Sequence, residues 1–339
     1  MNPFEPKRRL LTIAIPTYNR SELLKVQLTR LVPQLTPEVV CWVFDNASED
    51  STTEAVRPFL EHGIRYYRSP CNYGPTRNFV RCFEECDTDW LWLLSDDDAA
   101  HPEAVSRILN VVRNNSNGFI LTSDFCPSHP KESVAPTVRA LLDSAPLGPL
   151  FFISIMLFNT TKLRPYFNVL TELASTYASQ LALVLIWMER TGGTAMIAPI
   201  NVLADTRTVN DWSTLKGVAG LSQLPGCLKN EADQRTLAMK VLSDCYTLLL
   251  ILGLRETHVS GGIRRWKRAY RQTLYQLRCY GIPFLPMFVL RNFFRYGSRR
   301  TCLDLALIWL LAKAPAPVFR WIRPRLAARH SKNSECLDI

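Results

Sequence analysis

The first 125 residues alternate between short apolar runs and segments with helical periodicity, and this alternation constrains the fold more than any other feature. The runs with the length and composition of buried strands span residues 10–15, 39–44, 64–67, 90–94 and 118–123. Strands that alternate with helices form a parallel sheet covered by helices. The pattern therefore predicts an α/β protein with a mostly parallel sheet.

The segments between these runs carry helix signals. Ser21 is a candidate N-cap, and the helix expected after it repeats leucine on one face, at Leu24, Leu28, Leu31 and Leu35. Residues 77–85 have a second helical pattern. Pro102 lies where a proline favours the first turn of a further helix.

Beyond residue 123 the alternation loosens. Residues 126–149 contain five prolines and are predicted to form a loop. The segments expected after it are a strand at 151–158, a helix at 174–189 and a short strand at 196–198. From about Thr236 the pattern is helical and basic. We therefore expect an α/β domain over residues 8–235, a helical region over 236–330 and a flexible tail over 331–339.

The positive charge is concentrated in this last third. From Arg255 to Ile339 there are 17 Lys and Arg against 4 Asp and Glu, a balance of +13, so that residues 1–254 carry −3 of the total of +10. Residues 263–278 interleave arginine with Trp266 and Tyr270, as in an amphipathic helix at an anionic interface, and 282–300 and 303–325 repeat the mixture. Helices with solvated arginines packed on the α/β domain are the alternative. No nucleic-acid-binding motif accompanies the arginines, so nucleic acid is not expected as a partner.

Cysteine usage and hydropathy bear on localisation. The ten cysteines include no CxxC pair and no histidine at zinc spacing, which is typical of buried thiols in a reducing compartment. The polar first nine residues predict no signal peptide, and no stretch reaches the roughly 18–20 apolar residues that span a bilayer. We therefore expect a cytoplasmic protein, peripheral on the inner face of the cell membrane.

Polar clusters follow three of the predicted strands. They are residues 17–20, 45–48 and 95–98. Ligands of parallel sheets bind beyond the carboxyl ends of the strands, so the three clusters should line one crevice. Three adjacent carboxylates at 96–98 repel one another unless a cation or donors offset them, and Mg²⁺ or Mn²⁺ prefers such oxygen ligands. Acidic residues that favour a helix N-terminus are the alternative.

Residues 10–110 resemble the family 2 glycosyltransferases, which have the GT-A fold. Four motifs in order carry the resemblance: residues 15–20 (IPTYNR), 45–52 (DNASEDST), 72–74 (NYG) with 77–78 (RN), and 94–98 (LSDDD) followed by Pro102. The resemblance implies a GT-A-like mostly parallel sheet flanked by helices, followed here by the basic helical C-terminal region. It also implies a nucleotide-sugar donor and a metal, Mg²⁺ or Mn²⁺.

The resemblance assigns roles to individual residues. The donor site would include Pro16, Thr17, Tyr18, Asn19, Asp45, Asn72, Gly74, Arg77 and Asp96. Asp45 would accept a hydrogen bond from the base, although an Asp-Asn pair before serine suits an Asx turn equally well. Arg77 would contact the nucleotide, with a solvated helix-start arginine as the alternative. Asp97 would be the main metal ligand, and Asp98 a further ligand or a contact to the acceptor. Ser95 departs from the family by replacing the first aspartate of its DxD motif.

An inverting transferase needs a carboxylate that takes the proton of the acceptor hydroxyl. The family's acidic pair is missing before the helix expected at residue 174, and Glu172, one turn earlier, is the candidate base. A capping role is its alternative. Asp124, Asp205 and Asp211 are the other candidates.

Together these features predict an inverting, metal-dependent, hexosyltransferase-like glycosyltransferase. Its donor would be a nucleotide-diphosphate sugar, and its acceptor a glycan or lipid-linked intermediate of cell-surface polysaccharide synthesis at an anionic membrane surface. The rival hypotheses are a non-catalytic sugar-nucleotide or membrane-binding protein and a nucleotidyltransferase. The latter is disfavoured because no Gly-rich phosphate loop follows residues 10–15.

Overall fold

A computed structural model describes residues 9–124, 131–206, 214–242 and 262–281, with 310, 312–315 and 317–319 near the C-terminus. The chain divides into two compact units. The first comprises residues up to Ala145, Pro149–Ala174 and Ser179–Asn210, and the second comprises Pro146–Gly148, Ser175–Ala178 and the chain from Asp211 onward. The expected limits at residues 235 and 330 stay predictions. The expectations for 282–300, for most of 303–325 and for 331–339 lie outside the described residues.

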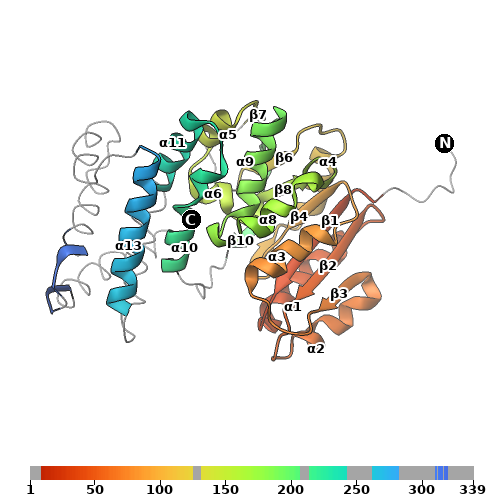
Figure 1. Cartoon of the computed structure of the whole chain (residues 1–339). Coiled ribbons are helices and arrows are strands. Elements are labelled where there is room, and N and C mark those ends of the chain that lie inside the picture. The colour runs from red at the N-terminus through yellow and green to blue at the C-terminus, as the bar shows by residue number, and fades with distance from the viewer. Residues whose placement is uncertain are drawn as a thin grey trace. The chain divides into compact units, whose positions relative to one another are not determined.

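Four parallel strands form one half of an eight-stranded sheet in the first unit (Figure 1). They are β1 (Leu11–Thr17), β2 (Val39–Asp45), β3 (Ile64–Arg68) and β4 (Trp90–Leu93), in the order β3-β2-β1-β4. Every residue of β1 and β4 is buried. Burial on both faces explains why these strands appear in the sequence as continuous apolar runs.

The helices between these strands cover both faces of the sheet. Helix α1 (Ser21–Leu31) packs against α2 (Thr52–Val56), whereas α3 (Pro75–Glu84) packs against β1, β2 and α8 (Asn168–Glu172). The chain runs outward from β1 to β3 and then returns to place β4 on the other side of β1. Because crossovers between parallel strands are right-handed, this reversal places α3 on the face of the sheet opposite to α1 and α2. The strand order therefore reverses at β1, where open α/β sheets bind their ligands.

The other half of the sheet is mixed. Strand β8 (Met156–Asn159) lies antiparallel between β4 and β6 (Phe119–Thr122), β9 (Ala195–Ala198) is parallel to β6, and β7 (Ser133–Ala135) is the edge. The expected α/β class with a mostly parallel, helix-flanked, GT-A-like sheet is confirmed. Helix α4 (Ala104–Val112) buries one face, while α9 (Ser179–Thr191) has ten consecutive buried residues and is a core helix. A separate two-stranded ribbon pairs β5 (Asp98–Ala100) with β10 (Leu203–Thr206).

Four local expectations are wrong. The segment expected to be a loop at 126–149 contains β7, α5 (Val138–Ser144) and the start of α6 (Leu147–Phe151). Thr137 caps α5 by accepting from the backbone of Ala140, a signal that the prolines obscured. The strand expected at 151–158 begins only at Met156, after a 3₁₀ turn, because β8 is a strand only where it pairs with β4 and β6.

The helix expected at 174–189 begins at Ser179, after a separate 3₁₀ turn. The N-cap position of α1 is Arg20 rather than Ser21. Ser21 is the first helical residue, and its backbone N–H donates to the Asp50 carboxylate at 3.1 Å. Asp50, from a neighbouring loop, therefore satisfies a donor that a local cap usually satisfies.

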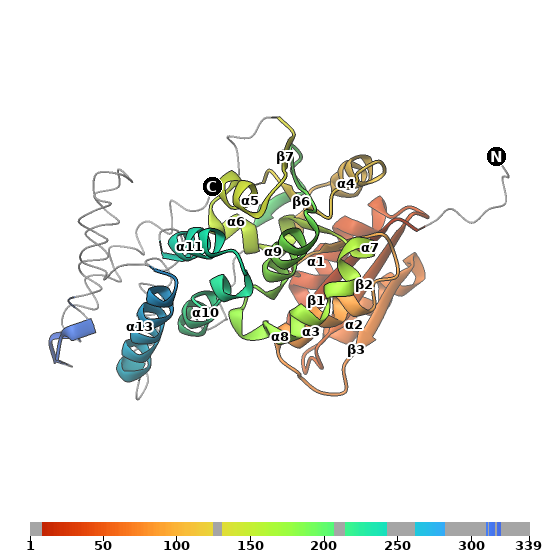
Figure 2. The same cartoon turned by 45° about the horizontal axis from the view of Figure 1, so that its top comes forward.

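The described part of the second unit is helical (Figure 2). The helices described there include α10 (Thr214–Leu221), α11 (Glu231–Lys240) and the long α13 (Gly262–Cys279), which packs against α10. The buried face of α13 includes Trp266 and Tyr270, whose rings stack at 5.9 Å, and the Trp266 ring meets Phe319 edge-on at 5.3 Å. Within the described ranges, no helix combines the length and apolar character of a membrane span.

Candidate functional site

The three polar clusters at the strand ends form one connected site. The backbone N–H of Asn46 donates to the carbonyl of Thr17 at 3.0 Å, which joins the ends of β2 and β1. The Thr17 hydroxyl donates to Oδ2 of Asp96 at 2.7 Å, which joins β1 to the loop after β4. Parallel strands that adjoin at their carboxyl ends bring these side chains together. The structure thus assembles the predicted clusters at the reversal point of the sheet.

The loop after β4, residues 95–98 and hereafter the acidic loop, holds two carboxylates on one cation. Nη1 of Arg20 contacts Oδ1 of Asp96 at 2.8 Å and Oδ2 of Asp97 at 3.1 Å. The Ser95 hydroxyl donates to the other oxygen of Asp97. Burial raises the pKa of Asp96 to about 6, although Arg20 and Thr17 favour its ionised form. The two carboxylates therefore depend on a positive charge between them.

The carboxylate of Asp98 has a different hydrogen-bond partner from those of Asp96 and Asp97. It begins β5, is buried, and accepts a hydrogen bond from the Ser154 hydroxyl at 2.6 Å. Burial raises the pKa of Asp98 to about 7. Its carboxylate therefore approaches the neutral form near physiological pH, in contrast to a carboxylate that is paired with a cation.

Gln27 fixes the backbone of the acidic loop. This buried side chain of α1 donates to the carbonyls of Ser95 at 3.2 Å and Asp98 at 2.5 Å, and accepts from the N–H of Ala100 at 3.1 Å. Gln27 was not predicted as a site residue from the sequence. Its position on the leucine face of α1 indicates a buried amide, and buried amides need hydrogen-bond partners.

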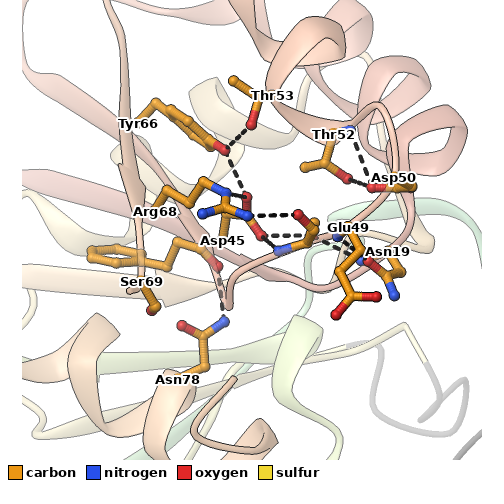
Figure 3. Close-up of polar contacts among 12 residues, drawn as sticks. Asn19, Asp45, Glu49, Asp50, Thr52, Thr53, Tyr66, Arg68, Ser69 and Asn78 are labelled. Carbon is orange, nitrogen blue, oxygen red and sulfur yellow. Dashed lines mark hydrogen bonds and ion pairs between the residues drawn. The ribbon is translucent and has the colours of Figure 1, made fainter. Parts of the chain in front are cut away.

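Asp45, at the end of β2, is enclosed by protein donors (Figure 3). Its carboxylate is 0% exposed. Oδ1 accepts from the backbone and the hydroxyl of Ser48, while Oδ2 accepts from the Tyr66 hydroxyl at 2.6 Å and lies 3.6 Å from Nε of Arg68. The Asx-turn alternative therefore describes the contact with Ser48, and a base that bonds Asp45 must displace one of these donors.

The loops after β1 and β2 also hold each other. Asn19 has φ of 54°, accepts at Oδ1 from the N–H of Glu49 at 2.7 Å, and donates its own N–H to the Ser48 hydroxyl at 2.9 Å. Pro16 lies buried within β1, in register with Phe44, and Tyr18 is partly exposed beside Asn19. Pro16, Tyr18 and Asn19 therefore lie at or next to the carboxyl end of β1.

Asn72 and Gly74 join the site through Asn46. The amide of Asn46 donates to Oδ1 of Asn72 at 2.8 Å and accepts from the N–H of Tyr73 at 3.0 Å. The N–H of Gly74 also donates to Asn72, at 2.8 Å. Gly74 has φ of 83°, a backbone conformation that favours glycine. This segment therefore borders the end of β2, and the donor-site role of Asn72 and Gly74 stays a prediction.

Arg77 makes a different contact. Its guanidinium pairs with Glu84 of the same helix at 3.0 Å, with both side chains 45% exposed. The neighbouring Asn78 is buried and donates to the carbonyl of Phe44 at 2.8 Å, which fixes α3 against β2. The contact of Arg77 therefore matches the solvated alternative, and its nucleotide role stays a prediction.

No candidate base contacts the acidic loop directly in the described part of the chain. Glu172 is the last residue of α8, is exposed, and accepts from the Asn168 amide at 2.8 Å, so it does not cap a helix start. Asp124 accepts from the backbone of Val202 and Leu203 at 2.9 and 2.8 Å, and burial raises its pKa. The side chain of Asp205, and Asp211 as a whole, lie outside the described residues.

The donor set of the acidic loop fits a divalent cation. Oδ1 of Asp96 and Oδ2 of Asp97 converge on one guanidinium nitrogen, so two hard oxygen ligands already face one point of positive charge. Within the described ranges, no group of three or more His, Cys, Asp or Glu side chains gathers to hold a metal. Mg²⁺ and related ions need only one or two carboxylates where phosphate oxygens and water complete the shell.

The fold and the strand-end site define an α/β protein of the GT-A class. Residues 12–171 match the model described as Glycosyl transferase family 2. The abequosyltransferase RfbV of Salmonella typhimurium is 32% identical over 102 residues, which are 29% of this chain and 31% of RfbV. The chain matches about a third of the length of its curated relatives.

Solved structures show the same fold. TarS of S. aureus superposes with a TM-score of 0.63 at 13% identity, covering 88% of this chain and 90% of the TarS chain. The mannosyltransferase PcManGT of Pyrobaculum calidifontis has a TM-score of 0.50 at 14% identity, covering 97% and 88%. These structures confirm the expected fold, and the family-model match confirms the expected resemblance to family 2.

Proposed function

We propose that this protein transfers a sugar from a nucleotide-diphosphate donor to a hydroxyl acceptor, with inversion. The observation that carries the proposal is the contact network of Thr17, Arg20, Asp96 and Asp97 at the point where the strand order reverses. Relatives support the donor class, because TarS has been solved with UDP-GlcNAc and PcManGT with GDP-Man and Mn²⁺.

Within this proposal the acidic loop holds Mg²⁺ or Mn²⁺. Asp97 would be the principal ligand, Asp96 would share the ion through Oδ1 while lying towards the ribose and diphosphate, and Asp98 would be a further ligand if it releases Ser154. The bound metal would offset the negative charge of the diphosphate leaving group. The protein itself orients these carboxylates through Thr17, Ser95 and Gln27.

The nucleoside lies, in this proposal, beyond the ends of β1 and β2. Tyr18 is partly exposed there and can contact a ribose or base, while Asn19, Asn72 and Gly74 shape the loops around it. Asp45 is the proposed base acceptor. A ring N–H would replace the Tyr66 hydroxyl, because a carboxylate oxygen that gives up one donor can take another of similar strength.

The proposed acceptor is a lipid-linked or polysaccharide intermediate at the cytoplasmic face of a membrane. Helix α13 supports membrane binding, because it contains no acidic residue and exposes Arg264, Arg268, Arg271 and Arg278 at helical spacing, with Tyr275 among them. Such residues each gain about 1 kcal/mol near an anionic surface. Binding to vesicles of phosphatidylglycerol and phosphatidylcholine should fall with salt and on changing Arg264, Arg268 and Arg271 to Gln. RNA binding without vesicle binding would contradict this part of the proposal.

The deciding experiment measures product formation from a panel of UDP- and GDP-sugars with Mn²⁺. We expect release of the nucleoside diphosphate from at least one donor, and a loss of about a hundredfold or more in Asp97→Asn, since electrostatic stabilisation at a leaving group is worth several kcal/mol. Asp143→Asn is the matched control, because Asp143 pairs with Arg139 on α5, away from the strand ends.

The products separate the rival functions. Release of pyrophosphate would indicate a nucleotidyltransferase. Donor binding without turnover would indicate a non-catalytic sugar-nucleotide protein, a reading that the lack of a base at the acidic loop in the described residues keeps open. Glu172→Gln and Asp124→Asn test the base in the same assay, where loss of kcat with retained KM for the donor is expected of the residue that accepts the proton.

A further inference from the structure

Arg20 stands out among the charged residues because one of its nitrogens serves two carboxylates. Nη1 lies 2.8 Å from Oδ1 of Asp96 and 3.1 Å from Oδ2 of Asp97. The side chains of Arg20, Asp96 and Asp97 are only 18%, 3% and 12% exposed. In these surroundings water screens the charges weakly, so the guanidinium is a strong counter-ion for both acids.

The position of Arg20 in the chain is unfavourable without those acids. It occupies the N-cap position of α1, an eleven-residue helix, where the partial positive charge of the helix N-terminus repels a cation. Only an anion can compensate for this placement. In the free protein the carboxylates of the acidic loop contact the guanidinium, and a diphosphate bound at the same strand ends would offer it another anion.

The guanidinium and a divalent ion cannot occupy this place together. Mg²⁺ takes carboxylate oxygens at about 2.0–2.1 Å, so an ion shared by Asp96 and Asp97 would lie where Nη1 now lies or directly against it. Two cations at that separation repel each other strongly in a site with little water. Metal binding to these two residues therefore requires Arg20 to leave.

We propose that Arg20 is an exchangeable counter-ion, which competes with the divalent metal for Asp96 and Asp97 and moves to the donor diphosphate when metal and donor bind. This inference rests on the proposed function. It gives Arg20 a role in coupling the two ligands, since the metal displaces the guanidinium and the diphosphate receives it. The planar guanidinium suits the second contact, because it bonds phosphate oxygens in pairs. Free metal should therefore bind weakly, and metal with nucleotide tightly.

Mn²⁺ binding measured by electron paramagnetic resonance, without any sugar donor, tests the proposal independently of activity. In the absence of nucleotide, Arg20→Gln should bind Mn²⁺ about tenfold more tightly than the wild type, since a hydrogen bond to a charged group no longer has to be broken. With UDP or GDP present the order should reverse, because the variant cannot contact the diphosphate. Arg20→Lys, which keeps the charge without the planar fork, should fall between the two proteins in both measurements.

Arg113→Gln is the matched control, since it removes an arginine that pairs with Glu38 at 2.8 Å on the surface of the same unit. Its Mn²⁺ affinity should equal that of the wild type. Unchanged or weaker Mn²⁺ binding in Arg20→Gln and Arg20→Lys without nucleotide would show a fixed structural ion pair and overturn the inference. The proposed metal site fails separately if Asp97→Asn binds Mn²⁺ as well as the wild type does. Circular dichroism of each variant confirms that the fold is retained.

Discussion

Two carboxylate sites at neighbouring strand ends differ in what satisfies them. Asp45, at the end of β2, receives hydrogen bonds from Ser48 and Tyr66, so neutral donors are its nearest partners, and the half-exposed Arg68 lies further away at 3.6 Å. Asp96 and Asp97, after β4, share a single guanidinium nitrogen of Arg20. The first site is complete without a ligand, whereas the second depends on a cation.

This difference indicates which part of the site responds to ligands. A carboxylate enclosed by neutral hydrogen-bond donors resists change, because removing a donor leaves a buried charge without a partner. A pair of carboxylates held by one cation can exchange that cation for another at lower cost. We therefore expect Asp45 to matter most for stability, and Asp96 and Asp97 to matter most for ligand binding.

The largest expected effect on stability is that of Asp45→Asn. The variant should lose about 1.5–3 kcal/mol in free energy of unfolding, because the neutral amide weakens the charge-assisted hydrogen bonds from Ser48 and Tyr66. Urea unfolding of the ligand-free protein measures this. Asp143→Asn, which removes an exposed ion pair, should cost less than about 1 kcal/mol. An equal loss of stability in ligand-free Asp97→Asn would contradict the expectation that Asp45 contributes more to stability than Asp97 does.

Tyr66→Phe should have the next largest effect. It removes the hydroxyl that donates to Asp45 at 2.6 Å and contacts the Thr53 hydroxyl at 2.9 Å. A hydrogen bond to a charged group contributes about 1.5–3 kcal/mol, so the variant should lose about 1.5 kcal/mol in urea unfolding. Burial raises the pKa of Tyr66 to about 12, so the wild-type hydroxyl stays protonated throughout the assay range. Tyr67→Phe, one residue further along the partly exposed edge strand, is the control and should change little.

Asp124 is an intermediate case, because protein donors surround it and yet burial raises its pKa above the ordinary value of 3.8. Well below pH 3.8 the Asp124 carboxyl is protonated in both the folded and the unfolded chain, so the penalty of a buried charge is absent. The loss of stability develops as pH rises from 3.8 to the raised pKa of the folded state, and it is constant above that pKa. Relative to Asp124→Asn, the wild type should therefore lose stability with rising pH, by at most about 1.4 kcal/mol per pH unit. A difference between the two proteins that is constant from about pH 4 to about pH 8 would contradict this.

Arg68→Gln should have the smallest effect. The guanidinium is 44% exposed and its Nε lies 3.6 Å from Asp45, although Nη2 also donates to the carbonyl of Ser48 at 2.8 Å. Ion pairs of this exposure contribute about 0.2–1 kcal/mol, and salt weakens them. Urea unfolding at low and high salt should show a loss within this range that shrinks at high salt. A loss as large as that of Tyr66→Phe would mean that Asp45 also depends on a cation.

The parallel half of the sheet was predictable because local pattern and tertiary environment agree there. Strands β1 and β4 are buried on both faces and β2 is largely buried, so they read as apolar runs, as for Leu11–Thr17 and Val39–Asp45. The antiparallel insertion of Met156–Asn159 between β4 and β6 depends on long-range pairing, which no local pattern encodes. The edge strand Ser133–Ala135 is short and mostly exposed, so it carries almost no apolar signal.

In the site, the clusters were predictable and their partners were not. Thr17, Asp45 and Asp96 follow strands that the apolar pattern reveals, so their convergence follows from the sheet. Tyr66 lies on a partly exposed strand and Gln27 on the leucine face of α1, and in both cases the sequence does not show which groups the polar side chain contacts. Arg20 lies in the recognised IPTYNR motif, but its pairing with two acids depends on the exact path of two loops.

The hydrogen bonds between Gln27 and three backbone groups also have an entropic consequence. Because this amide already restrains the chain at Ser95, Asp98 and Ala100, the acidic loop loses its conformational freedom during folding rather than during binding. A ligand that arrives there has only side-chain rotamers to order, so less of its interaction energy is consumed by immobilisation. Helix α1 thus preorganises the acidic loop through Gln27.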